Sequence, residues 1–378
     1  MASWFEPVLD RCLTALVSRL ADADKRRASI TRWCTRLRWC VRLISLGYAV
    51  LLVAVWLLMK FVGEGNLTLA FLLYSPQSIW LLPIPVLLVM ALLLDAPSLI
   101  VCLASAVLCV CGFLEYNFGN SSMPSANERA LTVLTFNRGE SGETSLQPFK
   151  NATKPHVLML PDATARSIRY VKSPGYEEFL FGDDIGEFSV VSRFHIKSKE
   201  LISHHDTPVA ARFTLDWEGR LVVLYTLHLP TPRFTLSSLR RGAFLWGVLG
   251  VVPGTSWAGK KESYESFFHN QIDIVRTVLA RVEAETEPCI LGGDFNAPGI
   301  GYIQHLATRK LTDAHAIAGS GSGHTFPGTT RNPLSLGGPW MRLDKLLSNS
   351  FLQPVWCKTE PDRASQHRSV AASFVLKP

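Results

Sequence analysis

Three long apolar runs follow one another in the first third of the chain, at residues 43–62, 69–94 and 96–114. Each run is long enough to cross the hydrocarbon core of a bilayer as a helix, which takes roughly 20 residues. A Ser-Pro pair interrupts the middle run. The alternative is a buried helical hairpin within a globular domain, but three such runs in succession exceed ordinary core helices. The pattern therefore predicts about three transmembrane helices, within a membrane region at 43–116.

The segment before the first run, residues 1–42, is basic and amphipathic. It carries nine lysines and arginines, whereas residues 63–77 carry none. Basic residues collect on the cytoplasmic side, so we expect a multi-pass protein of the cytoplasmic (inner) membrane with its amino terminus inside and an extracytoplasmic domain from about residue 117. Apolar residues from Phe5 to Leu20 recur at helical spacing. They predict an amphipathic helix, on the inner membrane surface or packed against the rest of the chain.

The pattern changes after residue 116. Residues 117–129 are polar with Gly and Pro, and we interpret them as a linker. From 130 to 378, short apolar runs alternate with turn residues, and one long amphipathic helix is predicted at 264–282. Many strands with few long helices favour an α/β domain of layered sheets with helices outside. The predicted strands are 131–136, 157–160, 188–192, 210–215, 221–227, 289–292, 342–347 and 371–376.

Charge and cysteine content add little to this picture. The net charge of the chain is +7, and the outer domain is close to neutral for its size. No basic stripe recommends nucleic acid as the partner, although nucleic acid stays an alternative. Cys289 and Cys357 are the only cysteines of the outer domain, and both fall in apolar runs without metal-ligand spacing. We interpret them as single buried thiols, with a disulfide as the alternative.

The predicted strand at 289–292 runs directly into Asp294 and Asn296, and then into a Pro-Gly turn. These two side chains alternate at strand period, so we expect both to point the same way from the carboxyl end of a strand. A carboxylate and an amide oxygen together suit a hard divalent cation and a phosphate. Further polar residues lie at the ends of other predicted strands, and strand ends that meet at one edge of a sheet form a single cleft. They are Asn137, Asp162, His228, Asp344 and His367.

This ordered series resembles the endonuclease/exonuclease/phosphatase superfamily, also called the DNase-like family, whose members hydrolyse phosphate esters with a divalent metal. LGGDFN is the most specific element of the resemblance. In the expected order around it stand TFN ending at Asn137, HLP beginning at His228, HTFP at 324–327, RLD ending at Asp344, and a Gln-His pair before the last strand. The resemblance covers roughly residues 130–376. It implies a four-layered α/β sandwich, two packed sheets flanked by helices, after the transmembrane helices.

The resemblance also implies catalytic roles. Asp294 and Asn296 would contact the attacking water, the phosphate or a metal, and His228 would hydrogen-bond a phosphate oxygen. His367 would be the general base or the transition-state stabiliser, oriented by Asp344. A carboxylate beside a histidine fixes its tautomer and favours the imidazolium that forms as charge develops.

The metal side implied by the resemblance consists of Asn137, Asp162 and Gln366, which would hold Mg²⁺ or Mn²⁺. Two of these positions depart from the family's pattern. Asp162 stands where the family usually has Glu, so its carboxylate is one methylene shorter. Gln366 stands where the family usually has Asp, and an amide oxygen ligates a hard cation more weakly than a carboxylate does. We therefore expect weaker metal binding or a single ion, and a catalytically impaired, membrane-tethered binding or scaffold domain is the alternative to an enzyme.

The substrate is suggested by the residues after His228. Arg233, Arg240 and Arg241 are candidates for binding a second phosphate. They precede an apolar run at 242–254, which is either a buried helix or loop or a lip that admits a lipid tail. Three spans before an outward-facing domain resemble a bacterial group of this superfamily linked to teicoplanin resistance, which implies undecaprenyl pyrophosphate as substrate. We therefore predict a hydrolase of a phosphate ester or pyrophosphate, possibly lipid-linked, with an outward-facing endonuclease as the alternative.

Overall fold

The computed structural model describes residues 5–21, 23–119, 122–124, 129–139, 145–237, 256–328, 337–363 and 365–377. The chain divides into two compact units, each made of two separate stretches of sequence. The helical unit comprises Met1–Ala54 and Trp80–Cys109. The α/β unit comprises Val55–Ile79 and Val110–Pro378.

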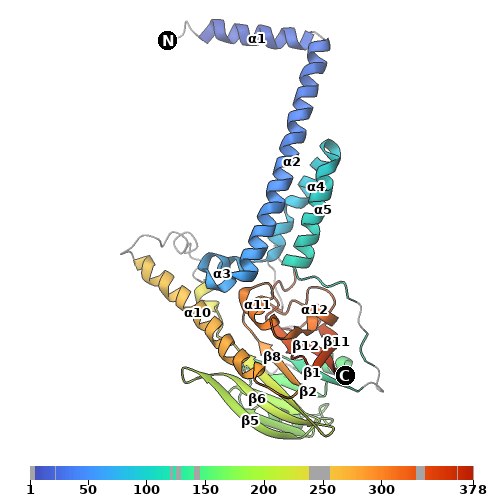
Figure 1. Cartoon of the computed structure of the whole chain (residues 1–378), viewed down its shortest axis with the longest axis vertical. Coiled ribbons are helices and arrows are strands. Elements are labelled where there is room, and N and C mark those ends of the chain that lie inside the picture. The colour runs from blue at the N-terminus through green and yellow to red at the C-terminus, as the bar shows by residue number, and fades with distance from the viewer. Residues whose placement is uncertain are drawn as a thin grey trace. The chain divides into compact units, whose positions relative to one another are not determined.

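Helices cover the amino-terminal segment and the three apolar runs (Figure 1). They are α1 (Phe5–Ala21), α2 (Ala23–Phe61), α4 (Pro83–Leu94) and α5 (Ala96–Val107), which continues into η3 (Leu108–Phe113). Within the helical unit, α2, α4 and α5 pack around Val41, Leu87 and Cys102. Arg42 pairs with Asp95, the acidic residue between the second and third runs, at 2.7 Å.

Among the described residues, three helical stretches are long and apolar enough to cross a membrane, as the sequence predicts. They are Lys25–Phe61, Gln77–Leu94 and Ala96–Phe113. The second stretch begins at Gln77 rather than at 69, because a separate helix, α3 (Leu67–Leu73), ends before Pro76. Proline has no amide hydrogen to continue a helix and disfavours helical backbone in the residue before it.

The α/β unit contains two six-stranded sheets with mixed strand directions (Figure 1). The first sheet has the order β11-β12-β1-β2-β4-β3, with β1 and β2 parallel. The second has the order β5-β6-β7-β8-β10-β9, with β7 and β8 parallel. The strands of the first sheet are β1 (Ala130–Thr135), β2 (Val157–Leu160), β3 (Phe181–Ile185), β4 (Phe188–Ser192), β11 (Leu352–Thr359) and β12 (Val370–Leu376). Those of the second are β5 (Ile196–His204), β6 (Thr207–Trp217), β7 (Arg220–His228), β8 (Cys289–Asp294), β9 (Thr312–Asp313) and β10 (Asp344–Ser348).

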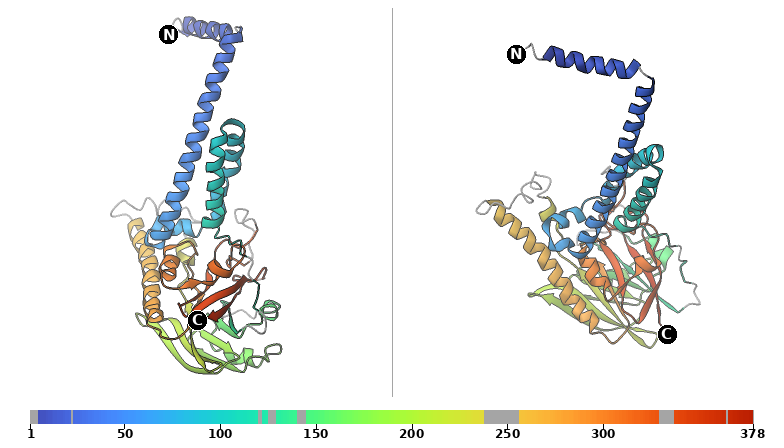
Figure 2. Two further views of the ribbon diagram at one scale, coloured as in Figure 1. Left: turned by 45° about the vertical axis from the view of Figure 1, so that its right-hand side comes forward. Right: turned by 45° about the horizontal axis from the view of Figure 1, so that its top comes forward.

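The two sheets pack face to face and carry helices on their outer faces, so the unit has four layers (Figure 2). The core between the sheets joins side chains such as Val133 and Met159 of the first sheet to Phe213 and Ile290 of the second. The long helix α10 (Ser256–Glu283) and the short α11 (Tyr302–Thr308) cover the second sheet, and α6 (Phe149–Thr153) and α7 (Ser167–Val171) cover the first. The predicted sandwich is confirmed.

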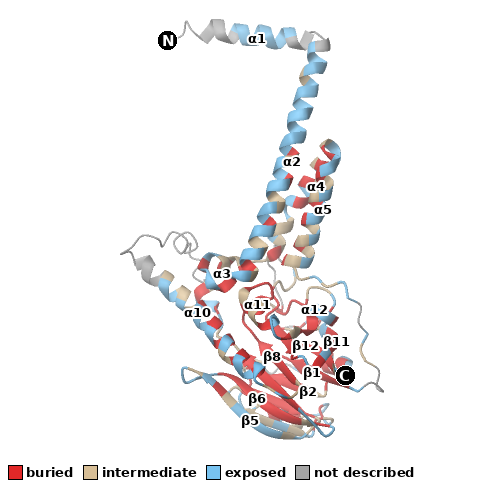
Figure 3. Ribbon diagram, in the orientation of Figure 1, coloured by how far each residue is buried: buried red, intermediate tan, exposed pale blue. Residues whose placement is uncertain are grey.

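All eight predicted strands are present, and four further strands were not predicted. Three of these give weak hydrophobic patterns. β3 and β5 are polar strands at sheet edges, β5 being largely exposed (Figure 3), and β9 has two residues. β11 contains Pro354 and a register shift beside it, which breaks the alternation. Cys289 and Cys357 are separate buried thiols.

The segment between α2 and α4 is built into the α/β unit. Glu64, in η1 (Gly63–Gly65), is 1% exposed, and its Oε2 accepts a hydrogen bond from the backbone N–H of Ile303 at 3.2 Å. The hydroxyl of Tyr74, just after α3, donates to the backbone carbonyl of Asn296 at 2.6 Å. The carbonyl of Tyr74 accepts from the indole N–H of Trp340 at 3.1 Å. These contacts join residues that are more than 200 positions apart in the sequence.

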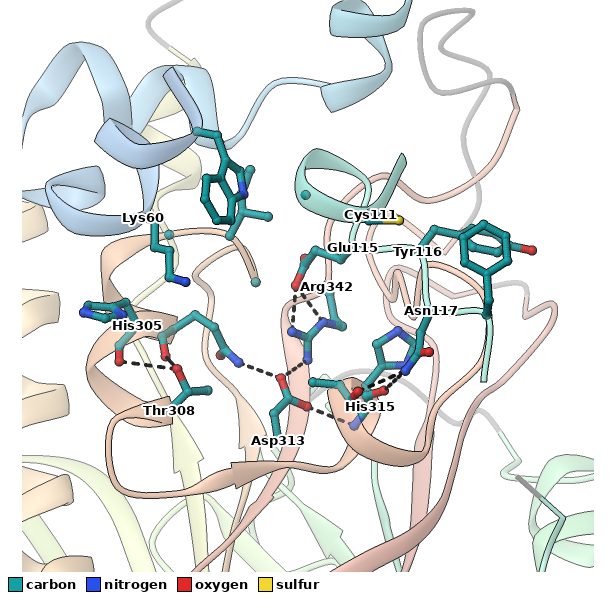
Figure 4. A pocket seen from close by; sticks show the side chains of 18 residues that line it. Lys60, Cys111, Glu115, Tyr116, Asn117, His305, Thr308, Asp313, His315 and Arg342 are labelled. Atoms are coloured by element: carbon teal, nitrogen blue, oxygen red, sulfur yellow. Dashed lines mark hydrogen bonds and ion pairs between the residues drawn. The ribbon is translucent and has the colours of Figure 1, made fainter. Parts of the chain in front are cut away.

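The chain that follows α5 is also anchored in the α/β unit. The buried guanidinium of Arg342 lies between the carboxylates of Glu115, at 2.7 Å, and Asp313, at 2.8 Å (Figure 4). Asn117 forms a β-bridge with Gly321. These acidic and basic groups line a cavity of about 620 Å³. Because their charges pair with one another, the network holds the start of the domain in place.

Candidate active site

The chain turns sharply where β8 ends. Gly293 has φ of +130°, and a Cβ there would lie 2.1 Å from the carbonyl oxygen of Leu227, so only glycine fits. Asn296 has a left-handed backbone with φ of +42°, a conformation that asparagine tolerates better than most residues. The expected strand alternation of Asp294 and Asn296 is therefore wrong, because β8 ends at Asp294. Both residues nevertheless line the same cavity.

Hydrogen bonds fix the turn at Asn296. Its backbone N–H donates to Oδ1 of Asp294 at 2.8 Å, and its side-chain amide donates to the carbonyl of Leu229 at 2.8 Å. Its carbonyl accepts the hydroxyl of Tyr74. Both donors and the acceptor carbonyl are thus engaged, and the amide oxygen makes no hydrogen bond with a described residue. The turn holds Asp294 in one rotamer beside the other candidate residues.

The sheet register gathers four candidate residues around Asp294. His228 ends β7 and Asp344 begins β10, and both stand directly opposite Asp294 in neighbouring strands. The side-chain amide of Asn137, after β1, donates to Oδ2 of Asp294 at 2.7 Å. His367 arrives at the same edge because it precedes β12, whose first residue pairs with the last of β1. The Nε2 atoms of His228 and His367 lie 3.9 and 3.8 Å from Oδ2 of Asp294.

Each histidine is also held by a second carboxylate. Nδ1 of His367 lies 2.9 Å from Oδ2 of Asp344, as the sequence predicts for an orienting carboxylate. Burial lowers the pKa of His367, but the charges of Asp344 and Asp294 raise it more, to about 9. Nδ1 of His228 lies 3.0 Å from Oε1 of Glu187. Burial lowers the pKa of His228, while that hydrogen bond and the charge of Asp294 raise it to about 9. Both imidazoles therefore favour the cationic form at neutral pH.

A cavity of about 560 Å³ opens onto these residues and brings in the other candidates. Asp162 lines it from the loop after β2, where its φ is +53°. Gln366 and Arg233, which begins α8 (Arg233–Ser237), also line it, and Nη2 of Arg233 donates to Oε1 of Gln366 at 2.9 Å. Arg240, Arg241 and the apolar run at 242–254 lie outside the described residues.

The oxygens of this cavity that suit a hard divalent cation lie on one side, at Asp162 and Asn137. Asp162 contributes a carboxylate to the cavity. The side-chain oxygen Oδ1 of Asn137 accepts a hydrogen bond from the backbone N–H of Gly139 at 3.0 Å and has a second lone pair. Gln366 is a poorer ligand than predicted, because its amide oxygen already accepts a hydrogen bond from a cation. Ligand atoms of Asp294, Asp344 and His367 also lie within 4.8 Å of one another. In that group, the imidazole of His367 and the carboxylate of Asp344 already pair with each other.

The sequence did not assign a role to several residues that line the cavity or contact its histidines. Glu187, which pairs with His228, lies in the turn between β3 and β4, where a polar residue gives no signal. Arg138 follows Asn137 directly, and its position in the TFN-R string could have found it. The ring of Phe326, in the HTFP string, lies 4.9 Å from the ring of His367. The larger cavity at Arg342 shares no lining residue with this one.

Several solved structures of other proteins are similar to this chain. The chain is similar to a humanized form of TDP2 from D. rerio, with 15% identity and a TM-score of 0.45 over 66% of this chain and 100% of the other. It is also similar to an endonuclease/exonuclease/phosphatase family protein from Bacteroides thetaiotaomicron, with 13% identity and a TM-score of 0.46 over 66% and 98%. A family counterpart from Beutenbergia cavernae has 16% identity and a TM-score of 0.43 over 66% and 72%. No curated protein matches the chain by sequence.

The family profile described as Endonuclease/Exonuclease/phosphatase family matches residues 139–367, which is more than half of the chain. The matched range begins at Gly139, directly after Arg138, and ends at His367. It contains the strands β2 to β11 and the turn at Asn296. The chain therefore belongs to the endonuclease/exonuclease/phosphatase family, and its function is of the phosphoesterase or nuclease kind.

Proposed function

We propose that the protein is a membrane-anchored, divalent-metal-dependent phosphoesterase that hydrolyses a lipid-linked phosphate ester or pyrophosphate at the outer face of the cytoplasmic membrane. The observation that carries this proposal is the cavity in which two histidines, each paired with a carboxylate of its own, flank the carboxylate of Asp294. Cations with fixed geometry bind phosphoryl oxygens, and a carboxylate between them positions a water molecule.

The roles of the residues follow from their partners. His228 and His367, each oriented by its own carboxylate, would donate hydrogen bonds to phosphoryl oxygens and offset the charge that develops on them. Asp294, held by the amide of Asn137, would orient the attacking water and take up its proton. A Mg²⁺ or Mn²⁺ ion held by Asn137 and Asp162 would neutralise phosphate charge as a Lewis acid.

The membrane part of the proposal rests on the three apolar helices and on the basic amino-terminal segment. Excess lysine and arginine before the first span favours a cytoplasmic amino terminus, and an odd number of spans then leaves the α/β unit outside. A reaction centre fixed at the membrane surface suits a substrate that resides in the bilayer. The proposed arrangement resembles that of the teicoplanin-resistance group, and undecaprenyl pyrophosphate is the candidate substrate.

Phosphate release by the purified full-length protein in detergent tests the activity. We expect turnover of a polyprenyl pyrophosphate with Mg²⁺ or Mn²⁺, and a fall of about 10²–10⁴-fold in His367→Ala. Nicking of DNA without release of phosphate from the lipid would favour the nuclease alternative. An absence of turnover on any phosphate ester, with metal binding demonstrated, would leave a binding or scaffold domain.

The orientation is tested separately in intact cells. Single cysteines placed at exposed positions of the α/β unit, such as Lys172, should react with a membrane-impermeant thiol reagent added from outside. A cysteine at exposed Arg26 should react only after the membrane is opened. The reverse pattern would contradict the outward-facing domain and the carrier-lipid substrate together.

A further inference from the structure

We propose that a second cavity of the α/β unit binds the head group of a membrane phospholipid that carries a phosphate and a primary ammonium group. This is the cavity at Arg342, which has a volume of about 620 Å³ and shares no lining residue with the reaction cavity. Its volume lies within the range of roughly 300–1,000 Å³ that is typical of ligand sites. We call it the head-group cavity. This inference rests on the membrane anchoring in the proposed function and not on the hydrolysis.

The head-group cavity lies beside the ends of two of the apolar helical stretches. Trp56 and Lys60 line it from the last turns of the first stretch, and Cys111 lines it from the last turn of the third. Tyr116 and Phe118, which are 42% and 74% exposed, line it from the chain that follows. Lysine and aromatic side chains at the end of a span mark the depth of the lipid head groups. Under the proposed membrane anchoring, this cavity therefore lies at the depth of the phospholipid head groups.

One side of the head-group cavity is cationic. The ammonium group of Lys60 points into the cavity beside His305 (Figure 4). Both side chains contact the ring of Phe61, which lies 4.8 Å from the ring of His305 and 5.7 Å from Nζ of Lys60. Burial and the charge of Lys60 lower the pKa of His305, so its imidazole is neutral at neutral pH and can donate one hydrogen bond. This side thus offers one positive charge and several N–H donors to a phosphate.

The other side of the head-group cavity is anionic. The guanidinium of Arg342 pairs with the carboxylates of Glu115 and Asp313, so these three lining residues together leave one negative charge. Arg342 donates only to Oε1 of Glu115, at 2.7 Å from Nη2 and 3.2 Å from Nε, and Oε2 of Glu115 accepts no hydrogen bond from a described residue. Lys345 and Glu64 are buried nearby without lining the cavity, and their opposite charges attract each other.

Gln304 adds a second acceptor to the anionic side. It is 5% exposed, and its Nε2 donates to Oδ2 of Asp313 at 2.6 Å, which fixes the orientation of the amide because an ionised carboxylate only accepts. Its Oε1 is buried, and no described residue donates to it. A buried acceptor is unfavourable unless a donor satisfies it. Oε1 of Gln304 and Oε2 of Glu115 therefore suit a primary ammonium group, which has three N–H donors.

The two sides of the cavity together match a zwitterion. Lys60 and His305 lie on one side, and Glu115 and Arg342 lie on the other (Figure 4). An anionic head group would match the first side and be repelled by the second, because like charges repel. A phosphoethanolamine group carries its phosphate and its ammonium a short distance apart, so it presents the opposite charge to each side.

Native mass spectrometry of the full-length protein in detergent measures lipid binding directly. The probes are phosphatidylethanolamine, phosphatidylglycerol and phosphatidylcholine with the same acyl chains. We expect phosphatidylethanolamine to bind about tenfold more tightly than the other two, because only this lipid combines a phosphate with N–H donors on an ammonium group.

Two pairs of variants test whether the lipid binds in the head-group cavity. Ala316→Trp should weaken phosphatidylethanolamine binding about tenfold, because Ala316 is exposed in α12 (Ala314–Ala318) and lines the cavity that the indole would fill. Ile317→Trp is its control, since Ile317 is also exposed but does not line the cavity. Lys60→Gln should weaken binding to a similar extent, because it removes the charge that faces the phosphate. Lys310→Gln is the matched control at an exposed position outside the cavity.

Equal affinity for the three lipids, or equal phosphatidylethanolamine affinity in Ala316→Trp and Ile317→Trp, would overturn the proposal. Tighter binding of phosphatidylglycerol would also overturn it and would assign the cavity to an anionic lipid. Glycerophosphoethanolamine should displace the lipid and inorganic phosphate should not; equal displacement by both would show a phosphate site without head-group selectivity and contradict the proposal. Binding requires no turnover, so selective binding by a protein that hydrolyses no phosphate ester would support the head-group cavity and contradict only the proposed enzymatic function.

Discussion

Substitution of Tyr74 by phenylalanine tests whether the segment between the first two apolar helices holds the active-site turn. The change removes one hydroxyl and keeps the ring, which lies 6.0 Å from the ring of Phe268. The backbone carbonyl of Asn296 then loses its 2.6 Å hydrogen bond and stays buried. A buried carbonyl left without its partner costs about 1–3 kcal/mol. If half of that cost falls on the turn, Asn296 leaves its left-handed conformation roughly two- to tenfold more often.

Hydrogen exchange followed by mass spectrometry measures this opening directly. In Tyr74→Phe, the peptide that contains Asp294 to Ala297 should exchange faster by about two- to tenfold, and phosphate release should fall in kcat with little change in KM. Tyr116→Phe is the matched control, because Tyr116 is 42% exposed and its hydroxyl makes no hydrogen bond with a described residue. Unchanged exchange at this peptide, or an equal change in both variants, would refute the reasoning.

Three other substitutions give separable outcomes. Asp344→Asn should lower phosphate release by about 10²–10⁴-fold because His367 loses its orienting charge; activity near that of the unmodified protein would contradict that role. Gln366→Asp should tighten Mn²⁺ binding roughly tenfold in a calorimetric titration, and unchanged affinity would show that Arg233 neutralises the new carboxylate. Burial lowers the pKa of His324 to about 4, so between pH 6.5 and 4 only the unfolded state gains a proton at this residue. The folded state should therefore lose up to about 3 kcal/mol of stability over that range. Denaturant titrations at several pH values should show a smaller loss in His324→Asn.

The sequence predicted the layers, and the meeting of most candidate residues in one cavity, because these depend on local patterns. Strands buried on both faces, such as β2 and β8, give uninterrupted apolar runs. The polar residues at their ends stand out against those runs. Asp294 and His228 could be placed together because parallel neighbouring strands end at the same edge of a sheet.

The remaining features depend on partners that are distant in sequence. The pairing of Glu187 with His228 joins a hairpin turn of one sheet to a strand end of the other, and neither position reveals the other. The polar edge strand β5 lacks an alternating apolar face, so it gave no strand signal. The prediction at Asn296 was wrong because it continued the strand alternation for two residues beyond Asp294. Asp294 is the last residue of β8 that pairs with β10, and Asn296 has a left-handed backbone.

The incorporation of Glu64 and Tyr74 into the α/β unit has a consequence for biosynthesis. These residues leave the ribosome before β1 does, and under the proposed topology they reach the outer side with the first span. The domain that is made later would then close around a segment already fixed at the membrane surface. A soluble fragment that starts at the linker would expose the faces that α3 covers and would leave the carbonyl of Asn296 unpaired. Membrane insertion would thus be a step in the folding of the hydrolytic domain itself.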